Sequence, residues 1–289
     1  MESFRLWLKK HHLSTYEKIR GILFPLVHAR RINAARHFTK RQIVSLSHDT
    51  KHWRMVIDPT NGFVDTHIFT SGVYEPDILT VIAEHLKPGD TFVDIGTNIG
   101  QHSLFAASIV GSTGHVVSFE PIPRLVAQFK ESITLNQWNN FMTVHECACS
   151  NDVGNFALQL KPGNIGGSGF HHTSTDYETI TVETIPADTK LGDESRVSFI
   201  KIDTEGHELE ALQGLTKTLH THHPILLVEF SPCFWGDDAA TKSALFFEIL
   251  TTNNYTILDL EDGHKEVTDT KNWFTNFTKL QTNLLCLPH

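Results

Sequence analysis

Four short segments of this sequence place acidic side chains beside glycines or at the end of an apolar run. The first is Asp94-Ile95-Gly96-Thr97-Asn98-Ile99-Gly100, in which Gly96 and Gly100 allow a tight turn and a close approach of a ligand to the backbone. A dinucleotide-binding turn carries glycine at the middle position, where this sequence has Asn98. The acid Asp94 with this wider glycine spacing suits a ligand with a positive centre and an ammonium group. S-adenosylmethionine, with its sulfonium and amino groups, fits that description.

The second segment ends in Glu120, which closes the apolar run that begins at Val116. A carboxylate there can accept hydrogen bonds from both hydroxyls of a ribose, as the acid about 20 residues further on does in dinucleotide folds. The alternative is that Glu120 only favours the start of the helix opened by Pro121-Ile122-Pro123. Because Glu120 follows the Asp94 loop in strand order, we favour cofactor binding.

The third segment, which ends in Asp203-Thr204-Glu205-Gly206-His207, offers three proton acceptors: Asp203, Glu205 and His207. Strand alternation puts Lys201 and Asp203 on one face. A lysine in a buried strand requires a partner, and we expect an acid of the neighbouring strand, such as Asp94. The alternative is a structural ion-pair cluster whose acids favour the helix N-terminus.

The fourth segment is the apolar run Ile225–Phe230, which carries one acid, Glu229, near its end. Asp203 and Glu229 could bracket a substrate hydroxyl or a divalent cation. Magnesium prefers more oxygen ligands than two acids supply, so we expect no metal.

The elements that must position these segments are short apolar strands alternating with helices from residue 76 onward. Alternation of this kind predicts a mostly parallel sheet covered on both faces, a doubly wound α/β fold in which ligands bind beyond the carboxyl ends of the strands. The expected strands are residues 91–95, 116–120, 142–149, 197–203, 225–230, 255–260 and 284–287, and the expected helices are residues 76–86, 99–110, 124–136, 209–219 and 240–251.

We expect two parts in the 289 residues: a basic helical N-terminal extension over 1–50 and a catalytic domain over 51–289. Within the second part we expect a hairpin over 51–75, because two runs rich in β-formers flank the turn-forming Asp58-Pro59-Thr60-Asn61-Gly62. The α/β core would then occupy 76–289, with an insertion over 150–197.

With these segments in order, the chain resembles the FkbM-type methyltransferase family of S-adenosylmethionine-dependent enzymes. The matching pieces are Gly72-Val73-Tyr74-Glu75-Pro76, Gly89-Asp90, the Asp94–Gly100 loop, Phe119-Glu120-Pro121, Ala148-Cys149-Ser150, Lys201-Ile202-Asp203-Thr204-Glu205-Gly206-His207-Glu208 and Glu229. The resemblance covers roughly residues 52 to 260. It implies the class I methyltransferase fold, a Rossmann-like sheet of seven strands whose seventh strand, here residues 284–287, is inserted antiparallel.

The resemblance also implies roles for particular residues. The methionine part of S-adenosylmethionine would be held by Asp94, Gly96, Asn98 and Gly100, the ribose by Glu120, and the adenine would lie near Ala148. Glu75 would help to close the site. Members of the family are associated with O-methylation of hydroxyl groups on sugars and polyketide-like products, and we therefore expect a small-molecule or glycan acceptor.

An aliphatic hydroxyl attacks a sulfonium methyl group poorly until a base accepts its proton. We expect Asp203 or Glu205 to accept that proton, with His207 behind them. Three rival functions stay open here: an NAD-dependent oxidoreductase, a non-catalytic adaptor with a nucleotide-binding fold, and nucleic-acid methylation. Asn98 and Asp94 count against the first, and an acidic body counts against the third.

The charge of the chain is uneven. Residues 1–41 carry ten Lys or Arg and two Glu, a net charge of +8, whereas the whole chain carries −9, which leaves −17 for the remainder. The basic segment could contact an anionic membrane or be only a solvated helical cap. Because we find no membrane-spanning run and no signal peptide, we expect a cytoplasmic protein without a nucleic-acid partner.

Two further features carry alternatives. Residues 161–172 hold four glycines, and this segment is either a lid over the site or a plain connection between two strands. The four cysteines, Cys147, Cys149, Cys233 and Cys286, are too sparse for a disulfide framework, and we expect inert core thiols.

Overall fold

The computed structural model describes residues 35–170, 177–192, 194 and 196–289. The N-terminal helical extension predicted over residues 1–50 therefore lies largely outside the described residues, and so do His171 and His172 of the glycine-rich segment. Within its described part the prediction is wrong for residues 42–48, which form a strand that pairs with the next one. The strands are β1 (Gln42–His48), β2 (Lys51–Ile57), β3 (Thr91–Ile95), β4 (His115–Phe119), β5 (Met142–His145), β6 (Ala148–Cys149), β7 (Gly154–Leu160), β8 (Glu178–Ile185), β9 (Phe199–Ile202), β10 (Ile225–Phe230), β11 (Tyr255–Asp259), β12 (Lys265–Glu266) and β13 (Thr282–Pro288). The α-helices are α3 (Phe63–Ser71), α4 (Pro76–His85), α5 (Gln101–Val110), α6 (Pro123–Asn136), α7 (Asp188–Leu191), α8 (Glu208–Gln213), α9 (Thr216–His222), α10 (Ala239–Thr252) and α11 (Thr270–Thr275).

The central sheet has the order β12-β11-β13-β10-β9-β3-β4-β5. β5, β4, β3, β9 and β10 pair in parallel, whereas β13 runs antiparallel between β10 and β11. This order and the inserted antiparallel strand confirm the class I methyltransferase fold. The sheet has one strand more than the seven predicted, because the two-residue strand β12 extends the edge at β11.

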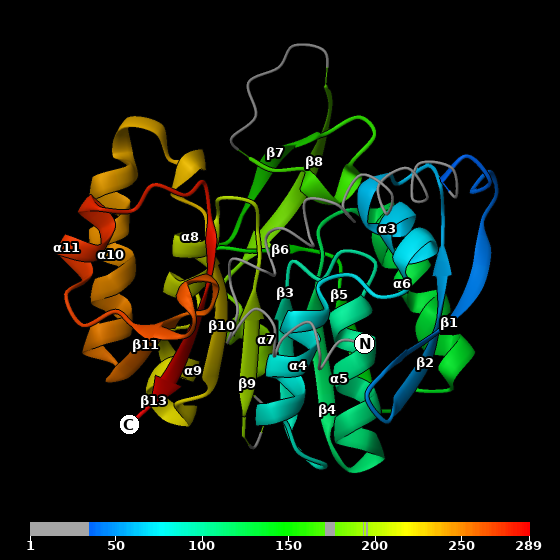
Figure 1. The fold of residues 1–289 in the computed structure, drawn as a ribbon, viewed down its shortest axis with the longest axis horizontal. Coiled ribbons are helices and arrows are strands. Elements are labelled where there is room, and N and C mark those ends of the chain that lie inside the picture. The colour runs from blue at the N-terminus through cyan, green and yellow to red at the C-terminus, as the bar shows by residue number, and fades with distance from the viewer. Residues whose placement is uncertain (1–34, 171–176, 193, 195) are drawn as a thin grey trace, which may run out of the picture.

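The alternating side chains of the parallel strands build two hydrophobic cores, one on each face of the sheet. Phe92 and Val116 face the core that includes α4, α5 and α6, whereas their neighbours Val93 and Val117 face the core that includes α8, α9 and α10. Figure 1 shows α4 and α5 in front of the sheet, with α10 and α11 at the far end from β1 and β2. Both faces are therefore buried, which explains why the strands read as unbroken apolar runs.

The hairpin predicted within residues 51–75 is wrong in its second strand. β2 pairs with β1, which precedes it, and residues 63–71 form the helix α3. The buried Asp65 explains the difference, because its Oδ1 accepts hydrogen bonds from the Asp58 backbone N–H at 2.7 Å and from Gln128 Nε2 at 2.8 Å. These tertiary contacts outweigh the β-propensity of the segment.

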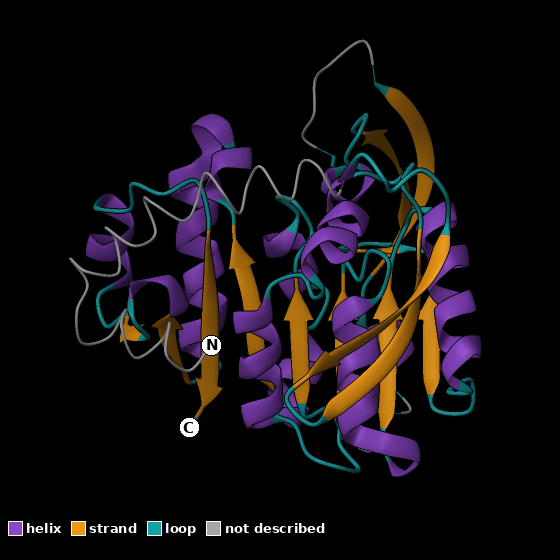
Figure 2. Cartoon of the chain, turned by 45° about the vertical axis from the view of Figure 1, so that its right-hand side comes forward, coloured by secondary structure: helices purple, strands orange, loops and turns teal. Residues whose placement is uncertain are grey.

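The segment predicted as an insertion carries a small sheet of its own, in the order β6-β8-β7. The single strand predicted over residues 142–149 is divided, because residues 142–145 pair with β4 and residues 148–149 pair with β8. Figure 2 shows this small sheet beyond the arrowheads of the parallel strands. It therefore stands at the edge where ligands bind in doubly wound folds.

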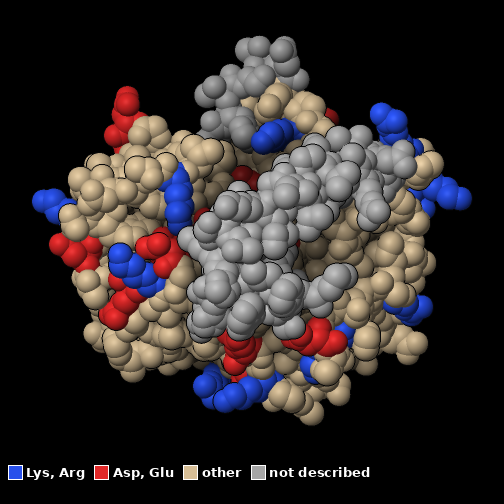
Figure 3. Space-filling model, viewed as in Figure 1, with Lys and Arg blue, Asp and Glu red and all other residues tan. Residues whose placement is uncertain are grey.

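In the view of Figure 3, Lys and Arg are mixed with Asp and Glu on the left and at the bottom, and isolated Lys and Arg groups stand along the right-hand edge. In the described ranges, none of the helices is both long enough and apolar enough to cross a bilayer. Three of the four cysteines are buried, but the expectation of four core thiols is wrong for Cys233, which is exposed next to the end of β10.

Candidate functional site

The turn from β3 to α5 is a loop that only glycine permits at two positions. Gly96 has a φ of +81°, and a Cβ added there would lie 1.8 Å from the backbone oxygen of Asp203. Gly100 has a φ of +84°, and its Cβ would lie 2.0 Å from the ring of Phe129. The glycines therefore bring this loop directly against the end of β9 and against α6. Asn98, at a φ of +54°, adopts the left-handed conformation that Asn tolerates best among non-glycine residues.

Asp94 lies beneath this loop and is fully buried. Its Oδ2 accepts hydrogen bonds from Thr97 Oγ1 at 2.8 Å and from Ser103 Oγ at 2.5 Å, and these bonds brace both ends of the turn. Its Oδ1 is buried and has no hydrogen-bond partner among the described residues. Burial raises the pKa of Asp94, and the Lys201 ammonium opposes that rise. The direct contact that the resemblance assigns to Asp94 stays a prediction.

Glu120 stands at the end of β4 and is 5% exposed. Its Oε2 accepts from the Asn98 backbone N–H at 2.8 Å, and its Oε1 accepts from the Ile122 N–H at 2.9 Å. Burial raises the pKa of Glu120 to about 7, against the lowering effect of these two hydrogen bonds. Glu120 thus fixes the Asn98 turn while its remaining lone pairs face a cavity.

Two neighbouring cavities open at this edge of the sheet. The Glu120 cavity measures about 520 Å³ including space open to solvent. Its polar lining residues include Glu120, Ser168, Thr204 and His207, and its apolar ones include Ile95, Phe119, Ile122, Ala148, Leu158 and Phe170. The Tyr74 cavity, about 570 Å³ on the same measure, is lined by Phe63, Tyr74, Ile99, His102, Asn164 and Lys201. Both are also lined by Gly96, Asn98, Gly166, Asp203 and Glu205. The shared residues place the two cavities side by side, so a ligand with a planar apolar group in the first could meet a second ligand at Asp203 and Glu205.

Asp203 lines both cavities, and its partner Lys201 lines the Tyr74 cavity. Lys201 is 4% exposed and its Nζ donates to Asp203 Oδ2 at 2.8 Å. The expected partner Asp94 lies directly across from Lys201 in the β3–β9 register, but the hydrogen bond goes to Asp203, two residues further along the chain. Burial disfavours the ammonium, but the carboxylates of Asp203, Asp94 and Glu75 outweigh this effect and raise the pKa of Lys201. Lys201 is therefore a permanently charged partner of the acids, not a base.

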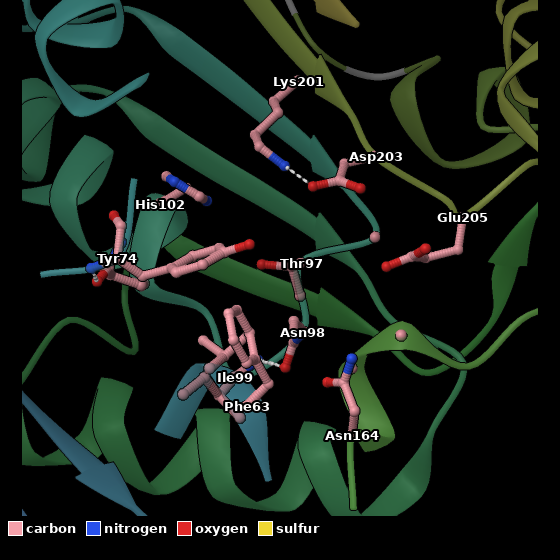
Figure 4. Close-up of a pocket in the computed structure, with 15 residues that line it drawn as sticks. Phe63, Tyr74, Thr97, Asn98, Ile99, His102, Asn164, Lys201, Asp203 and Glu205 are labelled. Carbon is pink, nitrogen blue, oxygen red and sulfur yellow. Dashed lines mark hydrogen bonds and ion pairs between the residues drawn. The ribbon is translucent and has the colours of Figure 1, made fainter. Parts of the chain in front are cut away.

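Glu205 follows on the turn after β9 in the left-handed conformation, with a φ of +52°. Burial, with the nearby charges of Asp203 and Glu208, raises the pKa of Glu205 to about 8, which Lys161 and Lys201 partly oppose. Figure 4 shows its carboxylate and that of Asp203 beside the same cavity. A carboxyl group with this pKa can accept a proton near neutral pH and release it again.

His207 is separated from Glu205 by one residue but lines only the Glu120 cavity. Its Nε2 lies 3.0 Å from Ser150 Oγ, its Nδ1 lies 3.6 Å from Glu210 Oε2, and its ring packs on Phe170 at a centroid distance of 4.8 Å. The structure thus brings Asp203 and Glu205 together at the Tyr74 cavity and places His207 on the other side of them.

His102 lines the Tyr74 cavity, and Glu75 lies behind it without lining the cavity, so its role in closing the site stays a prediction. Glu75 has a φ of +48° at the start of α4, and its Oε2 lies 3.6 Å from His102 Nε2. Burial and the Asp203 charge raise the pKa of Glu75 to about 7. Burial lowers the pKa of His102 well below its usual value, so the imidazole is neutral at physiological pH. Its buried Nε2 lacks a hydrogen-bond partner within the described part of the chain.

Two more acids support the site from behind. Glu208 Oε1 accepts from the backbone N–H groups of Thr204 and Gly206, which holds the Glu205 turn. Glu229, on β10, accepts from Gln281 Nε2 at 2.6 Å and from Ser231 Oγ at 2.9 Å. Burial raises the pKa of Glu229 to about 10, and the charge of Asp203 adds to this effect. Glu229 is therefore a neutral carboxylic acid at physiological pH.

Part of the glycine-rich segment lies over both cavities. Asn164 lines the Tyr74 cavity and Phe170 lines the Glu120 cavity. The Ile165 backbone N–H donates to the Asn61 carbonyl at 2.9 Å, and Ser168 Oγ donates to the Ile165 carbonyl at 2.6 Å. Of the two alternatives for this segment, the position of residues 161–170 agrees with a cover over the site.

In the described ranges, no group of three or more His, Cys, Asp or Glu could hold a metal ion. Sequence reasoning missed the residues that form the far wall of the Tyr74 cavity: Phe63, Val64, Gln101 and His102. Gln101 and His102 directly follow the glycine loop and could have been found from that position. Phe63 and Val64 could not, since they were assigned to a strand.

Comparison with known proteins adds a family to this geometry. The family profile described as "Methyltransferase FkbM domain" matches residues 94–257. The hexuronic acid methyltransferase AglP of Haloferax volcanii is 30% identical over 149 residues, which are 51% of this chain and 59% of that protein. A protein-L-isoaspartate O-methyltransferase of Ignicoccus hospitalis is 37% identical over 60 residues, 21% of this chain and 28% of that protein. This chain therefore spans less than two thirds of either relative.

Among solved structures, the FkbM methyltransferase of Methylobacillus flagellatus resembles this chain with a TM-score of 0.44 at 17% identity. That match covers 76% of this chain and 52% of that one.

Proposed function

Since this chain belongs to the FkbM methyltransferase family, we propose that it transfers a methyl group from S-adenosylmethionine to a hydroxyl group of a sugar, glycan or polyketide-like metabolite. The observation that carries the proposal is the pair Asp203 and Glu205, which lines both cavities at the carboxyl end of β9. A methyl donor seated in the Glu120 cavity would present its reactive group to these two acids, and the acceptor would meet it there from the Tyr74 cavity.

The residues present fit S-adenosylmethionine. Glu120 offers acceptor lone pairs to the two ribose hydroxyls, and the apolar lining that includes Phe119 and Ala148 suits an adenine ring. On the other side, the negative charge of Asp203 suits the sulfonium of the donor, a charge that S-adenosylhomocysteine lacks. The buried Nε2 of His102, which has no partner among the described residues, would find one in a polar group of a ligand.

When bound, S-adenosylmethionine supplies an activated methyl group, so the protein needs to align the acceptor and take up a proton. The acceptor oxygen forms its bond to the methyl carbon as the sulfur–carbon bond breaks, and the hydroxyl proton passes to the protein. Glu205 is the acceptor of that proton, because its pKa of about 8 lies near the working pH and its carboxylate faces the cavity. Asp203, fixed by Lys201, holds the hydroxyl and the positive donor in line.

Methylation of a carboxylate is the second candidate, because a hexuronic acid and an isoaspartyl residue, named in the two relatives, both carry one. A carboxylate is already a nucleophile and needs no base. The charge of Asp203 would repel it, whereas Asp203 and Glu205 together assist a hydroxyl. The charge of the site therefore favours the hydroxyl.

Two measurements test the proposal. In calorimetric titrations of the full chain, S-adenosylhomocysteine should bind and NAD should not; the reverse result overturns methyl transfer and revives the oxidoreductase. Products labelled from methyl-tritiated donor should then survive mild alkali, since methyl ethers are stable where methyl esters are hydrolysed. Release of the label as methanol would assign carboxylate methylation instead.

A further inference from the structure

Two aromatic rings form one wall of the Tyr74 cavity. Phe63 is 54% exposed although it is a large apolar residue, and its ring lies 6.1 Å from the Tyr74 ring at an angle of 89°. Figure 4 shows both rings on the side of the cavity opposite Asp203 and Glu205. A half-exposed aromatic ring at a cavity rim is typical of a surface that receives a ligand.

This wall is held in place by the surrounding backbone. Phe63 begins α3 directly after Gly62, where an added Cβ would lie 1.9 Å from the Gly163 carbonyl oxygen. Tyr74 is fixed from α5, because its backbone N–H donates to Gln101 Oε1 at 2.6 Å and its carbonyl accepts from Gln101 Nε2 at 2.7 Å. The rings are therefore preorganised, which lowers the entropy cost of binding a ligand on them.

The opposite wall is acidic and leaves no positive charge free for an anion. Among the described residues that line the Tyr74 cavity, Lys201 is the one lysine or arginine, and it donates to Asp203. Lys161 acts on Glu205 from the covering segment, and Tyr74 keeps its proton because burial and the nearby acids raise its pKa. The wall thus offers the carboxyl oxygens of Asp203 and Glu205 to hydroxyl donors, whereas a carboxylate on the ligand would meet the charge of Asp203 and, among the described lining residues, no unpaired cation.

We propose that the acceptor subsite is this space between the Phe63–Tyr74 wall and the Asp203–Glu205 wall, and that it takes an uncharged cyclic polyol such as a neutral pyranoside. The C–H face of the ring would lie on the aromatic wall, and its hydroxyls would donate to the acids. The inference rests on the proposed methyl transfer and narrows it, because it excludes uronates as acceptors.

The test uses the full chain saturated with S-adenosylhomocysteine and two probes that differ in one group: methyl β-D-glucopyranoside and methyl β-D-glucopyranosiduronate. Saturation-transfer difference NMR titrations should show the neutral glycoside binding about tenfold more tightly than the uronate. The transferred saturation should be strongest on one C–H face of its ring. Phe63→Ala should weaken the neutral glycoside about tenfold, and Phe63→Leu, which keeps apolar area without a flat ring, should remove the preference for one face.

Leu245→Ala is the matched control, because Leu245 is 42% exposed on α10 and does not line the cavity. Each variant is also titrated with S-adenosylhomocysteine by calorimetry, where unchanged affinity shows that the Phe63 variants fold. Equal or tighter binding of the uronate overturns the inference, as does a neutral glycoside that fails to bind or ignores Phe63→Ala. Failure of S-adenosylhomocysteine to bind the unmodified chain removes the proposed function itself, and the inference with it.

Discussion

Glu120 and Glu205 are two buried glutamates beside one loop, and their surroundings give them different chemistry. Both carboxylate oxygens of Glu120 accept backbone N–H groups, so this side chain is fixed in direction and its charge is already used to hold the Asn98 turn. The pKa of Glu205 is set by burial and by the charges of Asp203 and Glu208, with the lysines opposing them. Burial raises the pKa of both groups, to about 7 for Glu120 and about 8 for Glu205, so the difference lies in their partners. Two backbone N–H groups commit the Glu120 carboxylate to binding, whereas Glu205, beside Asp203 at both cavities, is placed to take up and release a proton. The Glu120 cavity is therefore a binding region and the Tyr74 cavity a reacting region.

Asp203→Asn should have the largest effect and should fall on the reacting region alone. The substitution removes the carboxylate that faces the donor and leaves Lys201 without its hydrogen-bonded charge partner. We expect turnover to fall below detection, by about 10³-fold or more, while S-adenosylhomocysteine affinity changes little. Calorimetry and a radiolabelled methyl-transfer assay on the same preparation measure both. Unchanged turnover would remove Asp203 from the reaction.

Glu205→Gln should lower kcat by about 10²-fold and should also remove a pH dependence. In the unmodified protein the base is active when deprotonated, so kcat/KM should rise as pH rises through about 8 and level off above it. The amide that replaces the Glu205 carboxylate cannot titrate, so the rate that remains should lose this rise. Glu84→Gln, at an exposed position on α4, is the control and should keep the full profile. A rise that persists in Glu205→Gln would assign the proton to another group.

Glu120→Gln should sharpen the comparison from the binding side. In this variant the side-chain NH2 of the introduced glutamine faces one of the two backbone N–H groups, so two donors meet and one hydrogen bond is lost. The neutral amide also accepts hydrogen bonds from ribose hydroxyls less well than a carboxylate does. We expect S-adenosylhomocysteine affinity to fall about tenfold or more, with kcat at saturating donor reduced less than about threefold. If instead kcat collapses while affinity holds, the two regions do not divide the work as described.

The sequence could predict the positions of these acids because each follows from local pattern. An acid at the end of an apolar run that is followed by a helix lies at the carboxyl end of a parallel strand, and Asp203 follows this pattern. The spacing of the glycines marks the turn between strand and helix. The position of Phe63 in the site could not be predicted in this way. Its segment alternates like a strand, and the helix there depends on Asp65, whose partners Asp58 and Gln128 come from other elements. The aromatic wall therefore emerges only when the tertiary contacts are known.

The same limit applies to the pKa values that separate the two regions. Burial raises the pKa of both Glu205 and Glu229, and the acids that follow β9 raise that of Glu229 further across the β9–β10 pair. Sequence spacing reports neither burial nor distances across a sheet. The partner of Lys201 illustrates the point, since register places Asp94 opposite it while the side-chain geometry favours Asp203. Strand order could be predicted from pattern, but the side-chain pairs could not.

Glu229→Gln should have the smallest effect, and it tests whether the charge of the reacting region extends to β10. The folded protein holds the Glu229 proton up to about pH 10, whereas the unfolded chain releases it near 4.5. The contribution of this group to the free energy of unfolding is therefore largest below about pH 4.5. It decreases progressively as the pH rises toward 10, because the unfolded state binds fewer protons than the folded state. The neutral Gln variant has no such loss. Its melting temperature relative to the unmodified protein should therefore increase between pH 5 and pH 9, by about 2 °C or more.

Loss of a hydrogen bond to Ser231 or Gln281 would lower the melting temperature of the variant by the same amount at every pH. The change of the melting-temperature difference with pH would then remain. Parallel melting curves across the range would mean that Glu229 is ionised in the folded protein, and the acids of β9 and β10 would then not act on one another as a group.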